Sequence, residues 1–382
     1  MRTYLIVIDS FGAGADSKAA AFGDEGSNTM LHASMAVPGV KWRFLGKMGL
    51  GNAAAIAGFQ PEGCLAVPKP LASYGILQKE GPGKDTLTGH WELAGLVTDM
   101  SLRIFPGKYP SFPDDLMTRL ERVAERPILG NRAASGTQII QELGEEAYDK
   151  KAIIAYTSAD SVLQLAAHEE AVPPEELYRI CRGARLICDD YQVGRVIARP
   201  FVGNPQEGYT RTAGRHDYSI EKPGQSCLED RLHEEGWTVT GVGKIGDIFN
   251  GDGIDVNYPD KGNTACFTRV LELAAAPREN PAPKELVFVN LVDTDMEYGH
   301  RRDPEGYCQE IERISGFLEK LWDLCVRGDK LIVTADHGCD PTFKGTDHTR
   351  EYVPLLVMEK DSGRPAENLG KMDSFSECIK RI

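Results

Sequence analysis

Short apolar runs recur along the chain, and each is followed by a polar or glycine-rich turn. Such runs, rich in β-branched residues, are typical of strands that are buried on both faces of a parallel sheet. Between residues 309 and 326 the apolar positions recur at helical spacing instead, which predicts a helix packed against the core. The pattern therefore predicts an α/β protein with a mostly parallel sheet flanked by helices. Its strands are expected at 4–8, 237–242, 286–292, 330–334 and, closing the sheet, 353–358.

The residue pattern of the sequence changes between residues 101 and 216. Phe-Pro dipeptides lead into a charged helical stretch at 114–125, and strand-like runs follow at 152–156 and 195–198. After residue 216 the pattern of short apolar runs followed by turns resumes. We interpret residues 101–216 as a separate α/β module inserted into a discontinuous core, which comprises residues 1–100 and 217–382.

The composition limits the kinds of molecule that the protein is expected to bind. The 382 residues are 41% hydrophobic and 26% charged, as in an ordinary globular protein, and the formal net charge is -14. This charge argues against binding to nucleic acid or to an anionic membrane, although bound divalent cations would still allow a small anionic substrate. The nine cysteines are scattered with no C-x-x-C pair, and neither a signal peptide nor a membrane-spanning stretch is expected. We predict a cytoplasmic protein.

Candidate metal ligands follow the 330–334 run. Asp336 and His337 come directly after it, Gly338 lets the backbone turn, and His348 arrives after a loop rich in glycine and threonine. Because adjacent strand residues point to opposite faces, Asp336 and His337 converge on one ion only if the strand stops there. Carboxylates mixed with imidazoles suit manganese or zinc better than calcium. The alternative is a polar loop in which His337 caps a backbone carbonyl.

Other strand ends carry similar chemistry. Asp9 follows the first strand, at the edge where open α/β sheets bind ligands, although it could instead cap a helix. The glycines after it do not complete a dinucleotide-binding fingerprint. The 286–292 run delivers Asp293, Asp295 and His300. If that strand persists, both aspartates lie on one side, so the spacing does not choose between them.

Thr86 is the candidate nucleophile. It follows a Gly-Pro-Gly turn, and a helix is expected from Asp85-Thr86 toward Leu93. The N-terminus of a helix favours an alkoxide or a phosphate, but a threonine there can also serve as an N-cap alone. A threonine hydroxyl is inert at neutral pH unless a base or a metal activates it, which links this loop to the metal ligands. Two cations about 3.5–4 Å apart would supply that activation, and phosphoryl transfer through a threonine follows.

Several cations could bind a phosphate in this acidic protein. They are Arg195, Arg199 and Arg211 in the inserted module and Lys244, which lies between glycines in the core. For the arginines, the alternative is that they are solvated surface side chains.

These motifs resemble those of the bacterial phosphopentomutases, members of the alkaline phosphatase superfamily. The resemblance spans nearly the whole chain, and its threonine and final histidine motifs differ from those of cofactor-independent phosphoglycerate mutases, which use a serine. The matching segments are Asp9-Ser-Phe-Gly, Lys84–Glu92, Tyr156–Gln164, Gly299–Pro304 and Ala335–Pro354.

The resemblance implies an alkaline-phosphatase-like core with an inserted cap. It implies an isomerase that interconverts ribose 1-phosphate and ribose 5-phosphate, and their 2-deoxyribose analogues, in nucleoside salvage. Thr86 would carry a phosphoryl group, primed by glucose 1,6-bisphosphate or ribose 1,5-bisphosphate, and would exchange it through a sugar bisphosphate.

The resemblance also implies a set of site residues and favours Asp295 over its neighbour. Of two Mn²⁺ ions, one would be held by Asp9, Thr86, Asp336 and His337, and the other by Asp295, His300 and His348. The residues near the sugar or its distal phosphate would be Asp160, Arg195, Ile197 and Arg211 in the cap and Lys244 in the core.

Two features depart from the family pattern. Cys339 stands where an asparagine is expected, which bears on local hydrogen bonding, and the tail from Lys360 onward is shortened and divergent, which bears on stability or assembly. Two other functions use the same residues. A two-metal phosphatase or phosphodiesterase would let water attack the phosphothreonine, unless a cap excludes it. A non-catalytic, metal-dependent binding protein would not need the Thr86 hydroxyl. The oligomeric state is left open, with a monomer as one option.

Overall fold

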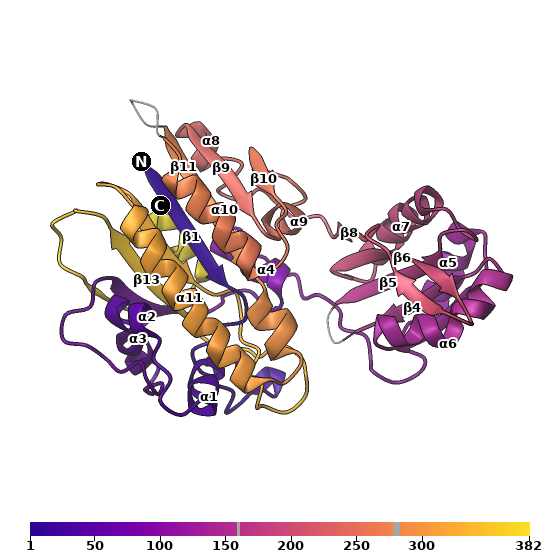
Figure 1. Ribbon diagram of the computed structural model, residues 1–382, viewed down its shortest axis with the longest axis horizontal. Coiled ribbons are helices and arrows are strands. Elements are labelled where there is room, and N and C mark those ends of the chain that lie inside the picture. The colour runs from indigo at the N-terminus through magenta and orange to yellow at the C-terminus, as the bar shows by residue number, and fades with distance from the viewer. Residues whose placement is uncertain (159–160, 278–282) are drawn as a thin grey trace. The chain divides into compact units, whose positions relative to one another are not determined.

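The computed structural model describes residues 1–158, 161–277 and 283–382. The chain divides into two compact units, one of Met1–Asp99 with Lys222–Ile382 and the other of Met100–Glu221 (Figure 1). The expected boundary between residues 216 and 217 falls inside strand β8 (His216–Ser219), which pairs with β6 (Arg195–Asn204) of the second unit. The second unit therefore continues to Glu221.

An eight-stranded sheet forms the centre of the first unit. β13 runs antiparallel to both of its neighbours, and the other pairings are parallel, so the predicted α/β class with a mostly parallel sheet is confirmed. β13 does not close the sheet as expected, because β2 and β14 lie beyond it. The strand order is β10 (Val256–Tyr258), β9 (Trp237–Val242), β11 (Lys284–Leu291), β1 (Arg2–Ile8), β12 (Lys330–Thr334), β13 (Val353–Glu359), β2 (Ser73–Leu77) and β14 (Asn368–Met372).

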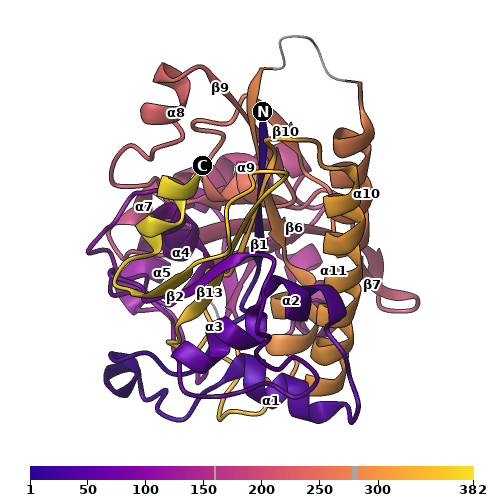
Figure 2. The same ribbon diagram turned by 90° about the vertical axis from the view of Figure 1, so that its left-hand side faces the viewer.

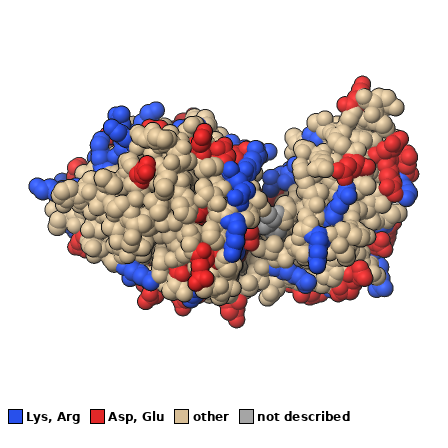
Figure 3. Space-filling view, turned by 90° about the horizontal axis from the view of Figure 1, so that it is seen from below, with Lys and Arg blue, Asp and Glu red and all other residues tan. Residues whose placement is uncertain are grey.

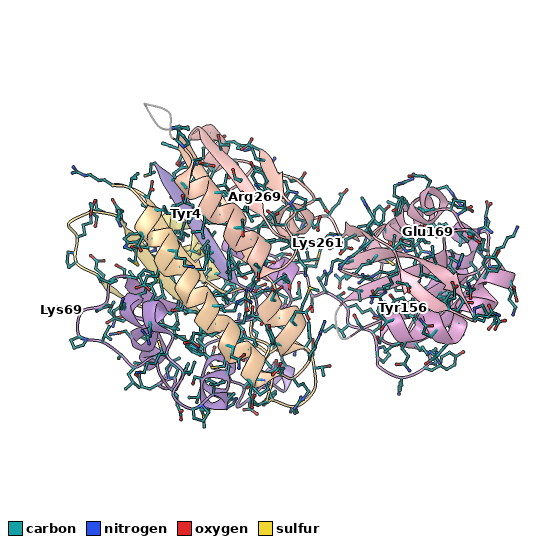
Figure 4. The ribbon with its side chains drawn as sticks, viewed as in Figure 1. Tyr4, Lys69, Tyr156, Glu169, Lys261 and Arg269 are labelled. Atoms are coloured by element: carbon teal, nitrogen blue, oxygen red, sulfur yellow. The ribbon has the colours of Figure 1, made fainter. Side chains whose placement is uncertain are left out.

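The position of β1 explains its sequence. It lies between β11 and β12, and residues 4–8, including Tyr4, labelled in Figure 4, have no exposed surface. Both pairings are parallel, with Ile8 opposite Leu291 and Val7 opposite Thr334. In parallel strands the carboxyl ends meet at one edge of the sheet. The segments that follow β1, β11 and β12 therefore start side by side.

Helices cover both faces of this sheet. α10 and α11 lie along one face, and α4 and α9 lie toward the other (Figure 2). α11 buries Ile311, Ile314 and Leu318, which confirms the predicted apolar stripe, but it begins at Pro304, where proline suits the first turn. The helices are α1 (Thr29–Ala36), α2 (Arg43–Met48), α3 (Leu50–Ile56), α4 (Thr86–Leu93), α8 (Arg231–Glu234), α9 (Ile245–Ile248), α10 (Asn263–Ala275) and α11 (Pro304–Leu324).

The second unit has a sheet and a hydrophobic core of its own. On one face of the sheet, α5 (Asp114–Ala124) and α7 (Pro174–Asp189) pack over a cluster that includes Leu163 and Val196. On the other face, α6 (Gly136–Asp149) packs over a cluster that includes Phe201 and Tyr156, the latter labelled in Figure 4. Strand β8 pairs with β6, off the main order of β3 (Ile128–Ala133), β4 (Ile153–Thr157), β5 (Val162–His168), β6 and β7 (Gly208–Arg211).

The surface carries charged side chains of both signs, as expected from the composition. Acidic and basic side chains both occur on the face of each unit seen in Figure 3, in a chain whose formal net charge is -14. In the part of the chain that the structure describes, no helix is both long and apolar enough to cross a bilayer.

Candidate metal centre

The ends of three neighbouring strands supply the acidic residues of the candidate site. Asp9 follows β1, Asp336 follows β12, and β11 ends at Leu291 and passes into a π-helical turn, Thr294–Gly299, that contains Asp295. Because β11 does not continue, the two neighbouring aspartates separate. Asp293 accepts a hydrogen bond from the backbone N–H of Asn263 at 2.8 Å, whereas Asp295 joins the histidines.

One cluster consists of Asp295, His300 and His348. The Nε2 atoms of His300 and His348 lie 3.2 and 3.4 Å from the carboxylate oxygens of Asp295, and the two nitrogens lie 3.1 Å apart. His300 Nδ1 lies 2.7 Å from the carbonyl of Thr346, a contact that fixes the ring with Nε2 toward the cluster. One ligand atom from each residue falls within 4.8 Å of the others, a spacing at which three ligands can bind one cation.

Electrostatics couple the members of this cluster. Burial lowers the pKa of His300, but the Asp295 carboxylate outweighs it, and the pKa lies well above its ordinary value. Burial likewise opposes the charge on Asp295, but His300 and His348 hold the pKa of this carboxyl well below its usual range. The negative charge of Asp295, which favours a proton on His300, would also attract a divalent cation bound by the same three side chains.

The second cluster contains Asp9, Asp336, His337 and Thr86. His337 Nε2 lies 3.4 Å from Asp9 Oδ1, 3.3 Å from Asp336 Oδ2 and 3.1 Å from the hydroxyl of Thr86. His337 Nδ1 lies 3.1 Å from the carbonyl of Gly338, so this ring nitrogen does contact a backbone carbonyl, as the alternative interpretation expected. The other ring nitrogen, Nε2, can still bind a metal ion. Burial lowers the pKa of His337 to about 4, so the ring is neutral at pH 7 and can bind a metal.

The hydrogen bonding of the buried carboxylates shows whether the site is suited to a cation. Asp9 Oδ1, Asp295 Oδ1 and Asp336 Oδ2 are buried, and they have no hydrogen-bond partner among the residues that the structure describes. Burial, together with repulsion from Asp336 and Asp295, raises the pKa of Asp9 well above its ordinary value. Buried acceptors without donors are costly, and divalent cations satisfy such oxygens. The residues therefore fit a metal centre. Asp295 offers a ligand atom within 4.8 Å of those of His300 and His348, and it also lies within 4.8 Å of ligand atoms of Asp9 and His337.

The start of α4 places the Thr86 hydroxyl. Asp85, in an extended conformation, is the N-cap, and its carboxylate accepts a hydrogen bond from the N–H of Thr88. The alternative in which Thr86 serves as the N-cap is therefore wrong. Thr86 is instead the first helical residue, half-buried, with its hydroxyl directed to His337.

The sequence interpretation missed two buried residues behind the ligands. Asn290 donates to Asp9 Oδ2 at 2.9 Å, and its amide nitrogen lies 3.3 Å from His90 Nε2. His90 Nδ1 lies 2.9 Å from the carbonyl of Thr86 and 3.2 Å from Asp336 Oδ2. Such partners orient ligating side chains. The one available signal was the spacing of four between Thr86 and His90, which places both on one face of α4.

The predicted substrate-binding residues are distributed over both units. Lys244 precedes α9 in the first unit, and its charge acts on Asp9. In the second unit, Arg195 Nη1 lies 3.9 Å from the Asp217 carboxylate, and Arg211 Nη2 donates to the hydroxyl of Tyr156 at 2.9 Å.

The remaining positions singled out in the sequence are Ile197, Asp160 and Cys339. Ile197 is buried on β6, two residues after Arg195 and so on the same face of the strand. Asp160 lies outside the described residues. Cys339 is buried, with its sulfur 3.8 Å from His300 Nδ1, the nitrogen that faces away from Asp295.

Comparison with known proteins agrees with this chemistry. The chain is 45% identical over 382 residues to a phosphopentomutase of Carboxydothermus hydrogenoformans, covering 100% of this chain and 94% of that protein. It is 47% identical over 377 residues to a phosphopentomutase of Anaeromyxobacter sp. (strain K), covering 98% and 93%. The chain belongs to the phosphopentomutase family. It is therefore an isomerase, and the resemblance expected from the motifs is confirmed.

Two further comparisons extend this assignment. Residues 1–380 match the family model described as the Metalloenzyme superfamily. The solved structure of the PH0037 protein from Pyrococcus horikoshii shares the fold, with a TM-score of 0.50 and 12% identity over 99% of this chain and 95% of that one. Membership of a metalloenzyme superfamily accords with the buried His and Asp clusters of this family member.

Close contact between α4 and the metal-ligand segment joins Thr86 to His337. A Cβ atom at Gly89 would lie 2.5 Å from the carbonyl oxygen of Asp336, so only glycine lets the helix approach this closely. Backbone atoms line the gap, and they cannot rotate away as a flexible side chain would. Gly89 therefore sets the spacing between α4, which carries Thr86, and the candidate ligand Asp336.

We predict that Gly89→Ala lowers the free energy of unfolding by about 1–3 kcal/mol and weakens Mn²⁺ binding, because the helix must move off Asp336. Urea unfolding and calorimetric titration with Mn²⁺ measure the two effects. The control is Gly316→Ala on α11, where the structure places nothing within 4 Å of the added atom. That variant should change stability by less than about 1 kcal/mol and leave Mn²⁺ affinity alone. Wild-type values for both quantities in Gly89→Ala would contradict the prediction.

Proposed function

We propose that this chain interconverts ribose 1-phosphate and ribose 5-phosphate, and their 2-deoxyribose analogues, in the cytoplasm during nucleoside salvage. The observation that carries the proposal is the half-buried Thr86 hydroxyl, which lies 3.1 Å from His337 Nε2 at the edge of the paired carboxylate and imidazole clusters. The relatives at 45% and 47% identity bear the name phosphopentomutase, which accords with a pentose phosphate substrate.

The ligand sets divide between two Mn²⁺ ions. Thr86 and its three neighbours in the second cluster, Asp9, Asp336 and His337, would hold one ion. The cluster of Asp295, His300 and His348 would hold the other. When bound, the ions would polarise the phosphoryl group and lower the pKa of the threonine hydroxyl. Neutral His337, whose pKa is lowered to about 4, keeps a lone pair available for this role at pH 7.

Thr86 acts as the phosphoryl carrier. In the active form its Oγ bears a phosphoryl group, primed from glucose 1,6-bisphosphate or ribose 1,5-bisphosphate. The free hydroxyl oxygen of the pentose phosphate attacks that phosphorus, the bond from phosphorus to Oγ breaks, and the proton of the sugar hydroxyl passes to Oγ. The sugar bisphosphate then presents its other phosphoryl group. Oγ attacks it, the bond from phosphorus to the sugar oxygen breaks, that oxygen takes the proton from Oγ, and the isomer leaves.

The second unit would serve as the cap that holds the sugar and its distal phosphate. Arg195 and Ile197 share one face of β6, and the buried Nε of Arg211 has no hydrogen-bond partner in the described part of the chain, so its guanidinium can still donate. We include Asp160 and, from the first unit, Lys244 in this set. A closed cap would keep water from the phosphothreonine, which distinguishes a mutase from a phosphatase.

We predict that the protein, with Mn²⁺ and a catalytic amount of glucose 1,6-bisphosphate, converts ribose 5-phosphate into ribose 1-phosphate. Phosphorus NMR follows both sugar phosphates and inorganic phosphate in one sample. Release of inorganic phosphate without ribose 1-phosphate would identify a hydrolase and contradict the proposal. Binding of ribose 5-phosphate without either product would indicate a non-catalytic binding protein.

We predict that treatment with glucose 1,6-bisphosphate adds one phosphoryl group to the wild-type protein and none to Thr86→Ala, because the acceptor oxygen is lost. Intact-mass analysis followed by peptide mapping measures the adduct. The matched control is Thr88→Val, since the Thr88 hydroxyl is buried and bonded to Asp85 and Lys79. This control should retain the adduct. A phosphoryl group that persists in Thr86→Ala would place the nucleophile elsewhere.

We predict that His348→Ala lowers the bound Mn²⁺ from about two ions to about one per chain, and that activity falls with it, because one cluster loses a ligand. Metal analysis after dialysis gives the stoichiometry. The exposed His233, paired with Asp255 at the surface, supplies the control His233→Ala, which should keep both ions. Full occupancy in His348→Ala would remove His348 from the ligand set.

A further inference from the structure

The loop between β2 and α4, which leads into Thr86, is held by two buried side chains of opposite charge. We infer that Arg350 and Glu92 are positioning residues for Thr86: together they bind the backbone of residues 79–83 and fix where the threonine hydroxyl is presented. This inference rests on the proposed role of Thr86 as phosphoryl carrier and deepens it. Neither side chain is a proposed metal ligand or carrier, so each would act through the loop.

Arg350 binds the carbonyl groups of the loop. Its Nη1 donates to the carbonyls of Gly81 and Gly83 at 2.7 and 2.6 Å, and its Nη2 donates to that of Lys79. Its Nε donates to the Asp16 carboxylate at 2.8 Å, which orients the guanidinium plane. The side chain is only 1% exposed. A planar group with five donors can reach three carbonyls and a carboxylate at once, which the single ammonium of a lysine cannot reproduce.

Glu92 binds the amide groups of the same loop. Its Oε1 accepts from the N–H of Glu80 at 2.7 Å, and its Oε2 accepts from that of Gly81 at 3.0 Å. Gly81 is therefore held from both sides, through its N–H by the glutamate and through its carbonyl by the arginine. These contacts satisfy backbone groups of the loop that would otherwise be buried without partners.

Both side chains connect the loop to segments that are distant in sequence. Arg350 follows the candidate ligand His348 by two residues, so the segment that supplies a ligand also holds the loop. Glu92 belongs to α4, and its Oε1 also accepts from the N–H of Phe375 at 2.9 Å. The divergent C-terminal tail is thereby bonded to the same carboxylate as the loop before Thr86. The tail takes part in positioning as well as in stability.

Small displacements of this loop should affect chemistry more than binding. A reacting oxygen that is misplaced by about 1 Å can lose about 100-fold in rate, even when the change is far from the chemistry. The pentose phosphate, by contrast, would be bound chiefly by other groups. Loss of either positioning residue should therefore lower kcat and leave KM largely unchanged.

The test uses the full chain with saturating Mn²⁺ and two conservative variants, Arg350→Lys and Glu92→Gln. We expect kcat and the rate of phosphoryl transfer from glucose 1,6-bisphosphate to Thr86 to fall by about 10- to 100-fold. KM should stay within about twofold of wild type, and bound Mn²⁺ should be retained.

Matched controls come from the opposite end of β1. Arg2 there donates to the carbonyl of Leu273 and to Glu285, and the buried Asp329 accepts from the backbone N–H groups of Arg2 and Val326. Arg2→Lys and Asp329→Asn remove similar interactions without touching the loop. They should lower the unfolding temperature and leave kcat unchanged.

Two outcomes would overturn the inference. One is wild-type kcat and a wild-type phosphoryl-transfer rate in folded Arg350→Lys and Glu92→Gln. The other is an equal fall of kcat in the controls, which would show that any loss of stability has this effect. If Arg350→Lys does not fold, Asp16→Asn must show the same split between kcat and KM, because it removes the charge that orients the guanidinium and keeps an amide oxygen that can accept from the N–H of Lys18. Wild-type protein that never acquires a phosphoryl group on Thr86 marks failure of the proposed function itself and would remove the basis of this inference.

Discussion

Buried carboxylates that meet at one edge of the sheet are the constraint on which the rest of this structure depends. Asp9, Asp295 and Asp336 are drawn together because β1, β11 and β12 are parallel neighbours whose carboxyl ends coincide. Three buried carboxylates this close together repel one another, and each keeps an oxygen without a hydrogen-bond partner in the described part of the chain. Histidines and divalent cations are the groups that relieve such a concentration of charge. The residues of this site therefore fit a metal ion.

Close packing brings the candidate nucleophile to this site. Thr86 begins α4, and Gly89, one turn later, brings the helix against the backbone of Asp336. His90 on the same face contacts both the Thr86 carbonyl and the Asp336 carboxylate. In the loop before the helix, backbone groups of residues 79–81 and 83 form hydrogen bonds with Arg350 and Glu92, which hold the loop in place. Catalysis by positioned groups needs this rigidity, because the gain comes from orientation fixed before the reaction.

The candidate chemistry lies in one of the two compact units. The first unit contains the candidate metal ligands and Thr86. The second has its own sheet and cores on both faces of it, which lets it serve as a separate body. A phosphatase needs only the chemistry of the first unit, whereas a mutase must also retain a bisphosphate and keep water out. The separate second unit accords with that additional requirement.

The sequence by itself determined the α/β class, the main strands, the apolar stripe of α11 and the family, because these depend on local periodicity and on short motifs. Spacing alone could not choose between Asp293 and Asp295, and only the resemblance favoured Asp295. The physical reason lies in the tertiary structure, where β11 ends at Leu291 and the N–H of Asn263, from another helix, binds Asp293. The sequence also could not identify Asn290, His90, Arg350 or Glu92 as supporting groups. Their roles arise from contacts between segments far apart in the chain, and only the packed tertiary structure creates those contacts.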